Sequence, residues 1–213
     1  RRGPWGRDDA RPGGLNVGAR GADEPEAVRE NRRRLAAALP SEPVWLRQVH
    51  GVAVHVARGP LEDEPVADAV VTDRPGLVLS VLTADCLPVL FADDRGRAVG
   101  VAHAGWRGLS AGVLERTVEA MRALLPSGAV LQAWMGPAIG QSAFEVGDEV
   151  LEAFVSQDSG AREGFAPGVR PGKWQADLYL LARRRLAAAG VARIDGGDFC
   201  TFTDSGRVWS YRR

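Results

Sequence analysis

Four short runs rich in β-branched and apolar side chains lie between residues 69 and 103, and they constrain the fold more than any other feature. The runs cover residues 69–72, 77–83, 87–91 and 98–103. Asp-Arg-Pro-Gly at 73–76 separates the first run from the second, and Asp-Asp-Arg-Gly at 93–96 separates the third from the fourth. Tetrapeptides of this kind are typical of turns between strands. The region therefore predicts a β-sheet built from neighbouring strands.

Helical patterns and further strand-like runs surround this region. Apolar residues recur at helical spacing, and a proline or glycine ends the longer patterns. The predicted helices cover residues 26–39, 109–125, 147–155 and 178–186. The further predicted strands cover residues 43–49 and 52–57, which we expect to form a hairpin, residues 130–135, and short terminal segments near Val191 and Val208. We expect the polar stretch 156–172 to be a mobile loop, and residues 1–213 to form a single domain.

The charge balance indicates a small ligand. The chain carries 27 Lys and Arg residues and 27 Asp and Glu residues, so it has no net charge to attract nucleic acid or an anionic membrane. It contains no stretch of about 18 apolar residues that could cross a bilayer, and residues 1–9 lack the apolar centre of a signal peptide. We therefore expect a cytoplasmic protein in which Cys86 and Cys200 are free thiols.

Three potential metal ligands stand beside strand-like runs or glycine turns. His50 lies in QVHG, Cys86 in TADCLP and His103 in AHAGWRG. Two imidazoles and one thiolate suit Zn²⁺, and three protein ligands leave one coordination position for water or substrate. The wide spacing excludes a zinc finger, so the ligands would have to gather from separate strand ends. Alternatively, Cys86 is a small core residue and the histidines only form hydrogen bonds, as we expect for His55.

Residues next to these ligands are candidates for contact with a substrate. Asp85 is expected either to orient a metal-bound imidazole or to transfer substrate protons; the alternative is a carboxylate that caps a turn. The turn that begins at Gly105 leads into a predicted helix. Main-chain N–H groups at the start of that helix, together with the Arg107 guanidinium, are therefore expected to hold an anion such as phosphate. Trp106 either stacks on a flat ligand or fills the core.

Longer strings of the sequence resemble the laccase-domain family, whose members are described as multicopper polyphenol oxidases, peptidoglycan editing factors or purine nucleoside phosphorylases. The strings are LRQVHG, ADAVVTDRPGLVLSVLTADCLPV, VGVAHAGWRGLSAGVLERTVEAM, WMGPAIG and WSYRR. The resemblance implies an α+β fold, a single-domain layered α/β sandwich with mixed sheets of the cysteine-hydrolase-like type. It also implies a zinc ion held by His50, Cys86 and His103.

The same resemblance implies an enzyme that acts on purine nucleosides. It would cleave adenosine, inosine or methylthioadenosine with phosphate, and would deaminate adenosine by hydrolysis. The implied catalytic residues are Cys86, Asp85 and Arg107, and the implied contacts for substrate or phosphate are Arg107, Trp106, Gly105 and Asn16. Asn16 is included because GLNVG at 14–18 is similar to the amino-terminal segment of the family.

Other functions stay open on the sequence alone. The metal site or Cys86 could hydrolyse an amide of a peptidoglycan precursor. A zinc-stabilised binding module would instead need a fourth ligand, for which Asp85 and Cys200 are the candidates, although Cys200 is expected mainly in the core. Polyphenol oxidase activity is expected only from Cu²⁺ bound at the zinc site, because three histidines cannot furnish the many imidazole ligands of a trinuclear copper cluster.

Overall fold

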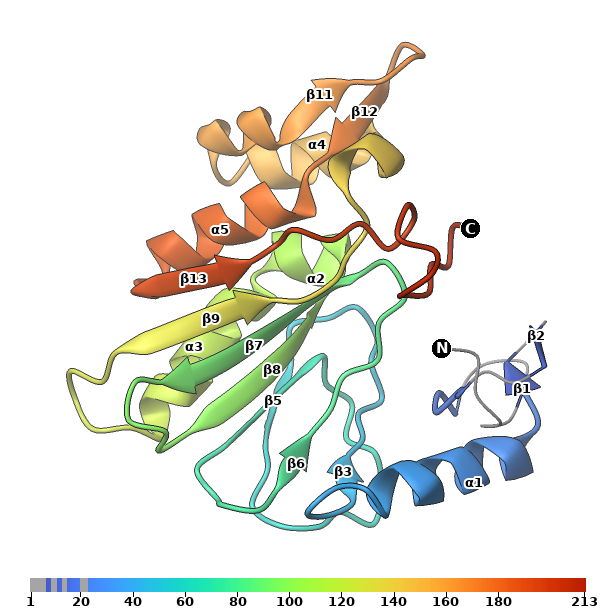
Figure 1. Cartoon of the computed structure of the whole chain (residues 1–213). Coiled ribbons are helices and arrows are strands. Elements are labelled where there is room, and N and C mark those ends of the chain that lie inside the picture. Colours follow the sequence, from blue (N-terminus) through green and yellow to red (C-terminus); the bar gives the residue numbers. More distant parts are fainter. Residues whose placement is uncertain (1–6, 9–10, 13–14, 20–22) are drawn as a thin grey trace.

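The chain folds around a six-stranded mixed sheet (Figure 1). The structure is a computed structural model that describes residues 7–8, 11–12, 15–19 and 23–213. The described helices are α1 (Pro25–Ala36), α2 (Trp106–Ala111), α3 (Val113–Ala123), α4 (Asp148–Val155) and α5 (Leu178–Ala188), with 3-10 helices at Gln141–Ala143 and Ser159–Gly164. The described strands are β1 (Arg7–Asp8), β2 (Arg11–Pro12), β3 (Pro43–Val44), β4 (Val54–Val56), β5 (Ala69–Thr72), β6 (Val78–Leu79), β7 (Leu87–Asp93), β8 (Val99–Ala104), β9 (Leu131–Met135), β10 (Glu145–Gly147), β11 (Phe165–Pro167), β12 (Lys173–Ala176) and β13 (Arg193–Gly196).

The main sheet has the strand order β13-β9-β7-β8-β5-β4. Its outer pairs, β13 with β9 and β4 with β5, are parallel, and its inner pairs are antiparallel. Side chains alternate along β7, so Leu87, Val89 and Phe91 are buried while Leu90 is exposed. The fold is therefore a mixed α/β arrangement with mixed sheets, built on the region in which the sequence predicts neighbouring strands.

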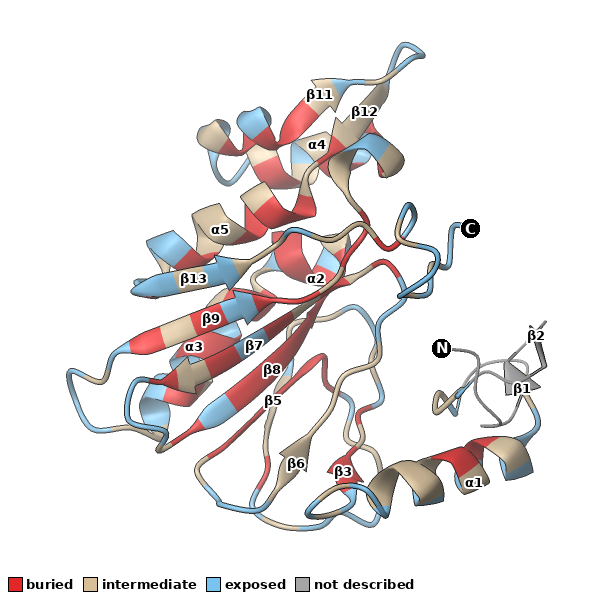
Figure 2. Cartoon of the chain, viewed as in Figure 1, coloured by how far each residue is buried: buried red, intermediate tan, exposed pale blue. Residues whose placement is uncertain are grey.

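Helices α2, α3 and α5 lie on one face of this sheet (Figure 1). Leu114, Val118 and Met121 follow one another at helical spacing along α3, and all three are buried. The helix approaches the sheet closely at Gly100, where a Cβ atom would lie 3.2 Å from the sulfur of Met121. The buried residues of the central strands and of the helices above them form the principal core (Figure 2).

The opposite face of the main sheet is covered only in part. The short parallel pair of β3 and β6 packs on it through a second apolar cluster that includes Val44 and Val70. Beyond β6 the face forms an open groove of about 700 Å³. Leu90, Val99 and Trp134 line this groove and are each 42–45% exposed.

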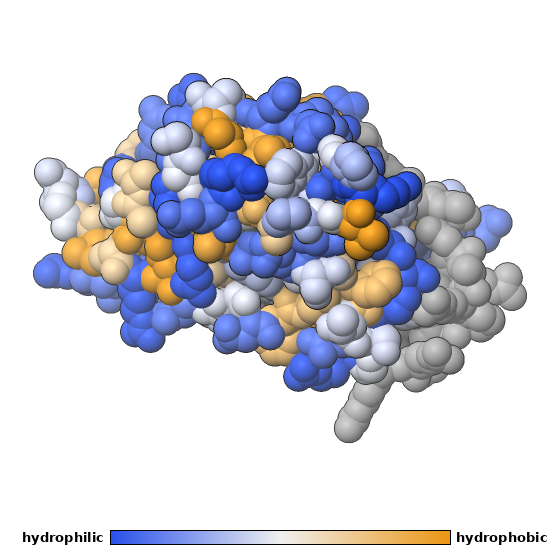
Figure 3. All heavy atoms as spheres, turned by 90° about the horizontal axis from the view of Figure 1, so that it is seen from above, coloured by the Kyte–Doolittle hydropathy of each residue, from blue (hydrophilic) through white to orange (hydrophobic). Residues whose placement is uncertain are grey.

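A separate antiparallel sheet, β10-β12-β11, packs with α4 at one end of the molecule. The surface seen from that end is mostly hydrophilic, with scattered apolar side chains (Figure 3). The stretch 156–172, which we expected to be a loop, contains the 3-10 helix Ser159–Gly164 and strand β11. This region therefore carries more regular structure than its polar sequence indicates.

Three further predictions about elements were wrong. Strands β3 and β4 do not form a hairpin, because β3 pairs with β6 and β4 pairs with β5, both in parallel. The helix predicted over 109–125 is two helices, α2 and α3, divided at Gly112, whose φ of 103° interrupts the helical path. The residues around Val208 form turns instead of a strand.

Candidate metal centre

The three predicted ligands come together at one end of the main sheet. The ligand atoms of His50, Cys86 and His103 all lie within 4.8 Å of one another. Cys86 Sγ is 3.7 Å from His50 Nε2, close to the distance of about 3.5 Å expected between a sulfur and a nitrogen bound tetrahedrally to Zn²⁺. The two imidazole rings meet edge to face, with their centroids 4.7 Å apart. This donor set therefore fits one divalent metal ion.

Sheet register and one glutamine bring the ligands together. The antiparallel register of β7 and β8 pairs Pro88 with His103, so Cys86, just before β7, lies beside the end of β8. His50 comes from the loop between β3 and β4. The Gln48 side chain fastens this loop to the loop that carries Cys86, because its amide donates to the main-chain oxygen of Leu82 at 2.9 Å and accepts from the Leu82 N–H at 2.8 Å.

Two glycines allow helix α2 to approach the ligand loops. A Cβ atom at Gly105 would lie 2.8 Å from Cδ2 of His50 and 2.9 Å from the sulfur of Cys86. At Gly108 it would lie 2.8 Å from the main-chain oxygen of Gly51. Any side chain at either position would push α2 away from the ligands, so both glycines are needed for this packing.

Asp68, which the sequence did not single out, contacts two of the three predicted ligands. Its side chain is fully buried, and it accepts a hydrogen bond from Nδ1 of His103 at 2.9 Å. It also accepts hydrogen bonds from the N–H groups of Val49, His50 and Gly51. The sequence feature that could have identified Asp68 is its position, because it is an acidic residue directly before the wholly apolar start of β5.

The ligand His50 and Asp85, which precedes the ligand Cys86, have strained main-chain conformations. His50 has a φ of 60° and Asp85 a φ of 81°, values that residues other than glycine seldom adopt. Such strain costs on the order of 1–3 kcal/mol and is found preferentially at functional sites. At His50, the contacts of the loop with Asp68 offset part of this cost.

The charges of the site depend on the same contacts. Burial by itself lowers the pKa of His103, but hydrogen bonds from its ring to Asp68 and Cys86 outweigh burial and raise the pKa to about 9. Burial lowers the pKa of His50, and the positive charges of His103 and Arg107 lower it further. Hydrogen bonds from His103 and from two main-chain N–H groups hold the pKa of Asp68 below its ordinary value, although burial acts in the opposite direction. A metal cation bound here would replace the proton on His103.

Asp85 contacts the carboxyl-terminal segment. Its carboxylate accepts hydrogen bonds from the Thr201 hydroxyl at 2.6 Å and from the Arg212 N–H at 2.9 Å. The residue is 7% exposed, and its main-chain oxygen accepts from the N–H of Ile139. Orienting an imidazole was one of the roles expected for Asp85, whereas in the structure Asp68 makes that contact with His103.

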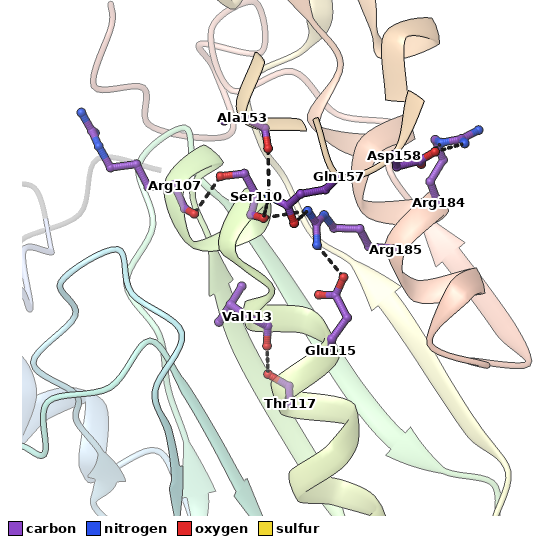
Figure 4. A network of polar contacts seen from close by, with 10 residues as sticks. All are labelled: Arg107, Ser110, Val113, Glu115, Thr117, Ala153, Gln157, Asp158, Arg184 and Arg185. Carbon is purple, nitrogen blue, oxygen red and sulfur yellow. Dashed lines mark hydrogen bonds and ion pairs between the residues drawn. The ribbon is translucent and has the colours of Figure 1, made fainter. Parts of the chain in front are cut away.

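Arg107 extends from the first turn of α2, four residues after His103. Its side chain is exposed and points away from the helices (Figure 4), and the guanidinium lies 4.6 Å from the ring of Trp106. Helix α2 begins at Trp106 and has six residues, and anion binding by its first N–H groups together with Arg107 stays a prediction. The guanidinium is the positive group that the structure offers to an anion here.

The other predicted site residues lie in different surroundings. Asn16 binds within its own segment, because its side-chain oxygen accepts from the N–H of Gly18 and its amide donates to Asp23. Cys200 lies outside the ligand group and is half-buried, and its sulfur accepts from the N–H of Gly140 at 3.2 Å. His55 is in β4, also outside the group.

A polar network fixes the far end of α2 (Figure 4). Arg185 of α5 donates to the main-chain oxygen of Ser110 at 2.7 Å and to Glu115 of α3 at 2.6 Å. Gln157 donates to the same Ser110 oxygen at 3.0 Å. The carbonyl at the end of α2 is thereby satisfied, and the short helix that carries Arg107 is held at its far end.

Comparison with known proteins places this arrangement in a family. A family model described as "Multi-copper polyphenol oxidoreductase laccase" matches residues 3–213. The chain belongs to this laccase family. A purine nucleoside phosphorylase of Pseudomonas aeruginosa is 51% identical to it over 203 residues, which cover 93% of the chain and 80% of the relative. The purine nucleoside phosphorylase YfiH of Escherichia coli is 52% identical over 202 residues, which cover 93% of the chain and 81% of the relative.

Solved structures agree with the fold of this laccase-family chain. Protein NMB0706 of Neisseria meningitidis is 43% identical, with a TM-score of 0.89, and the match covers 98% of the chain and 84% of that protein. YlmD from Geobacillus stearothermophilus is 29% identical, with a TM-score of 0.81 and the same two coverages. Within the described residues, every helix is too short or too polar to cross a bilayer.

Proposed function

We propose that this chain is a zinc-dependent purine nucleoside phosphorylase in which residues 1–213 act as one catalytic domain. The observation that carries the proposal is the convergence of His50, Cys86 and His103, in a chain that shares about half of its residues with relatives named purine nucleoside phosphorylase. The cysteine-hydrolase-like fold type stays part of this proposal. The partners of the chain would be nucleosides and phosphate, which are consistent with a cytoplasmic location.

Zn²⁺ is the metal we propose for the three ligands. Two imidazoles and a thiolate form a borderline-soft donor set, and three protein ligands leave one position open. A bound zinc ion supplies Lewis acidity and lowers the pKa of a coordinated water to about 7. Cu²⁺ is the alternative occupant, because imidazole ligands also suit copper. Copper at this site would support at most weak oxidation of phenols.

Phosphorolysis replaces a carbon–nitrogen bond with a carbon–oxygen bond. A phosphate oxygen bonds to C1′ of the ribose, the bond from C1′ to the purine nitrogen breaks with its electron pair on the purine, and the purine takes up a proton. We propose that Arg107 holds the phosphate, because a guanidinium binds phosphate oxygens in pairs and stabilises their charge as the bond forms. Its exposure and its position after His103 support this role.

The neighbouring residues supply the remaining roles of the proposal. The half-buried ring of Trp106 offers a surface for the purine base, and Gly105 leaves room beside the ligands. Asp85 is the candidate for proton transfer to the departing purine. For Asn16 we propose an indirect role, in which it shapes the loop at residues 15–19 through its contacts with Gly18 and Asp23.

Hydrolytic deamination of adenosine is a second candidate activity. The specific observation in its favour is the three-ligand donor set, which leaves a position where a water molecule could bind and be activated. In this reaction the oxygen of water bonds to C6 of the purine and ammonia leaves. Phosphate has no part in it, so the two activities can be separated by omitting phosphate.

The test is incubation of zinc-loaded protein with inosine, adenosine and methylthioadenosine, each with and without phosphate. We expect hypoxanthine and ribose 1-phosphate from inosine only when phosphate is present, and inosine from adenosine in either case. Cys86→Ala should abolish both reactions, whereas Cys200→Ala, which removes a thiol outside the ligand group, should retain them. If no phosphate-dependent product forms, the phosphorylase proposal fails; a muropeptide amide or a catechol with added copper would then be the next substrate to test.

A further inference from the structure

We propose that Asp68 is the positioning residue of the metal centre, fixing the ring of His103 and the main chain of His50 with one carboxylate. The inference rests on the proposed metal centre but concerns a residue outside the ligand set. It gives Asp68 a role in metal affinity that can be measured without any turnover.

The contacts of Asp68 reach both histidines. Oδ1 accepts from the His50 N–H at 2.9 Å and from Nδ1 of His103 at 2.9 Å. Oδ2 accepts from the N–H groups of Val49 at 3.1 Å and Gly51 at 2.7 Å. The main-chain oxygen of Asp68 also accepts from the His103 N–H at 2.7 Å. Each histidine is therefore tied to Asp68 through a separate set of bonds.

The bonds to the His50 loop determine where that imidazole lies. Three successive N–H groups, from Val49 to Gly51, surround one buried carboxylate, which is the arrangement of a main-chain anion nest. This nest holds His50 at its φ of 60°, a conformation that a residue with a bulky side chain seldom adopts. Without the carboxylate, these three N–H donors would lose their acceptor and the loop would relax.

The bond to His103 determines which ring nitrogen faces the metal. Because Nδ1 donates to Asp68, Nε2 is the nitrogen left for the ligand group. Carboxylates in this position fix the ring orientation of a metal-bound histidine, and their loss typically weakens metal affinity by about 10–100-fold. Asp85, the other buried acid near Cys86, is bound to Thr201 and Arg212 instead. The geometry therefore selects Asp68 over Asp85 for this role.

The test compares Asp68→Asn with Asp93→Asn in metal-free protein titrated with Zn²⁺ against a competing chelator. Both variants replace a buried carboxylate that accepts several main-chain N–H groups, but Asp93 bonds to residues 95, 97 and 98 at the turn between β7 and β8. In Asp68→Asn one carboxylate oxygen is replaced by an NH₂ group. This group cannot accept hydrogen bonds from the two donors that it faces. We expect zinc affinity to fall about 10–100-fold in Asp68→Asn and to stay at the wild-type level in Asp93→Asn.

Equal zinc affinity in Asp68→Asn and the wild type would overturn the inference and leave the proposed metal centre standing. A wild-type protein that binds no zinc would overturn both. If Asp68→Asn does not fold, nitrogen NMR of zinc-loaded wild type decides the question. Zinc on Nε2 of His103 with a proton on Nδ1 supports the inference, and zinc on Nδ1 overturns it.

Discussion

Gly105 decides how closely helix α2 approaches the ligands. In Gly105→Ala the new methyl group would lie 2.8 Å from the His50 ring and 2.9 Å from the sulfur of Cys86, so the ligand group must open. We expect zinc affinity to fall at least about tenfold, as for other losses of ligand support, while circular dichroism stays that of the folded protein. The matched control is Gly59→Ala, where the added methyl group would meet no atom within 4 Å beyond its neighbours in the chain. Equal loss of affinity in both variants would contradict this role.

Tyr179 connects the glycine loop after β9 to the carboxyl-terminal segment. Its buried hydroxyl accepts from the N–H of Ala138 at 2.7 Å and lies 2.8 Å from the main-chain oxygen of Phe199. Burial raises the pKa of this hydroxyl to about 12, so it stays protonated through the neutral range. Tyr179→Phe leaves these partners unsatisfied and should lower the free energy of unfolding by about 1–3 kcal/mol. Urea unfolding measures this change in the free energy of unfolding. The control is Tyr211→Phe at an exposed position, which should change stability by less than about 0.5 kcal/mol.

The ligands were predictable from sequence and the residue that positions them was not. His50, Cys86 and His103 belong to rare residue types in this chain and stand beside strand-like runs or glycine turns, so their chemistry is visible in the sequence. Asp68 is one of 27 acidic residues. Its role follows from the parallel pairing of β4 with β5, which brings it under the His50 loop. That pairing was not predicted from the sequence, which offered Asp85 as one candidate for the orienting role.

At the scale of elements, the turn between β7 and β8 depends on the buried Asp93. Its carboxylate accepts from the Arg97 guanidinium and from main-chain N–H groups of the turn. Burial alone would raise the pKa of Asp93, but these bonds outweigh burial and lower it to about 2. Since the folded pKa lies below the unfolded value, the stabilisation is complete above about pH 4 and is lost as the pH falls toward 2.

Asp93→Asn should remove this acid-sensitive part of the stability. We expect the difference in free energy of unfolding between wild type and variant to be constant from pH 7 to 5 and to shrink between about pH 4 and 2. Urea unfolding at a series of pH values measures it. Asp94→Asn, at the more exposed neighbouring position, should show no such dependence, and a difference that stays constant down to pH 2 would contradict the assignment.

Strands with local partners were predictable, and elements that depend on distant contacts were not. Strands β5, β7 and β8 lie in a region of clear turns and apolar runs, and the structure has them there. The hairpin predicted about Gly51 was wrong because β3 pairs with β6 and β4 with β5, and Asp68, 17 residues away in sequence, binds the loop between β3 and β4. The apolar spacing over 109–125 did not predict that the helix is divided at Gly112, since the pattern continues on both sides of the glycine.

At the scale of the whole molecule, a bound metal would join three segments that are distant in sequence. The metal bonds would add to the contacts of Gln48 with Leu82 and to the pairing of β7 with β8, which already connect these segments. Zinc that binds only the folded chain should therefore raise its stability by mass action, by about 2.7 kcal/mol at a free concentration 100 times the Kd. Thermal unfolding with and without zinc measures this gain, and Cys86→Ala should lose it.

The central claim is that His50, Cys86 and His103 form one metal centre in the folded chain. Elemental analysis of protein purified without added metal tests it most directly, with Cys200→Ala as the control for loss of a thiol. The account predicts one zinc per chain in the wild type and in Cys200→Ala, and none in Cys86→Ala. A wild type without stoichiometric metal, or a Cys86→Ala variant that keeps it, would contradict the account.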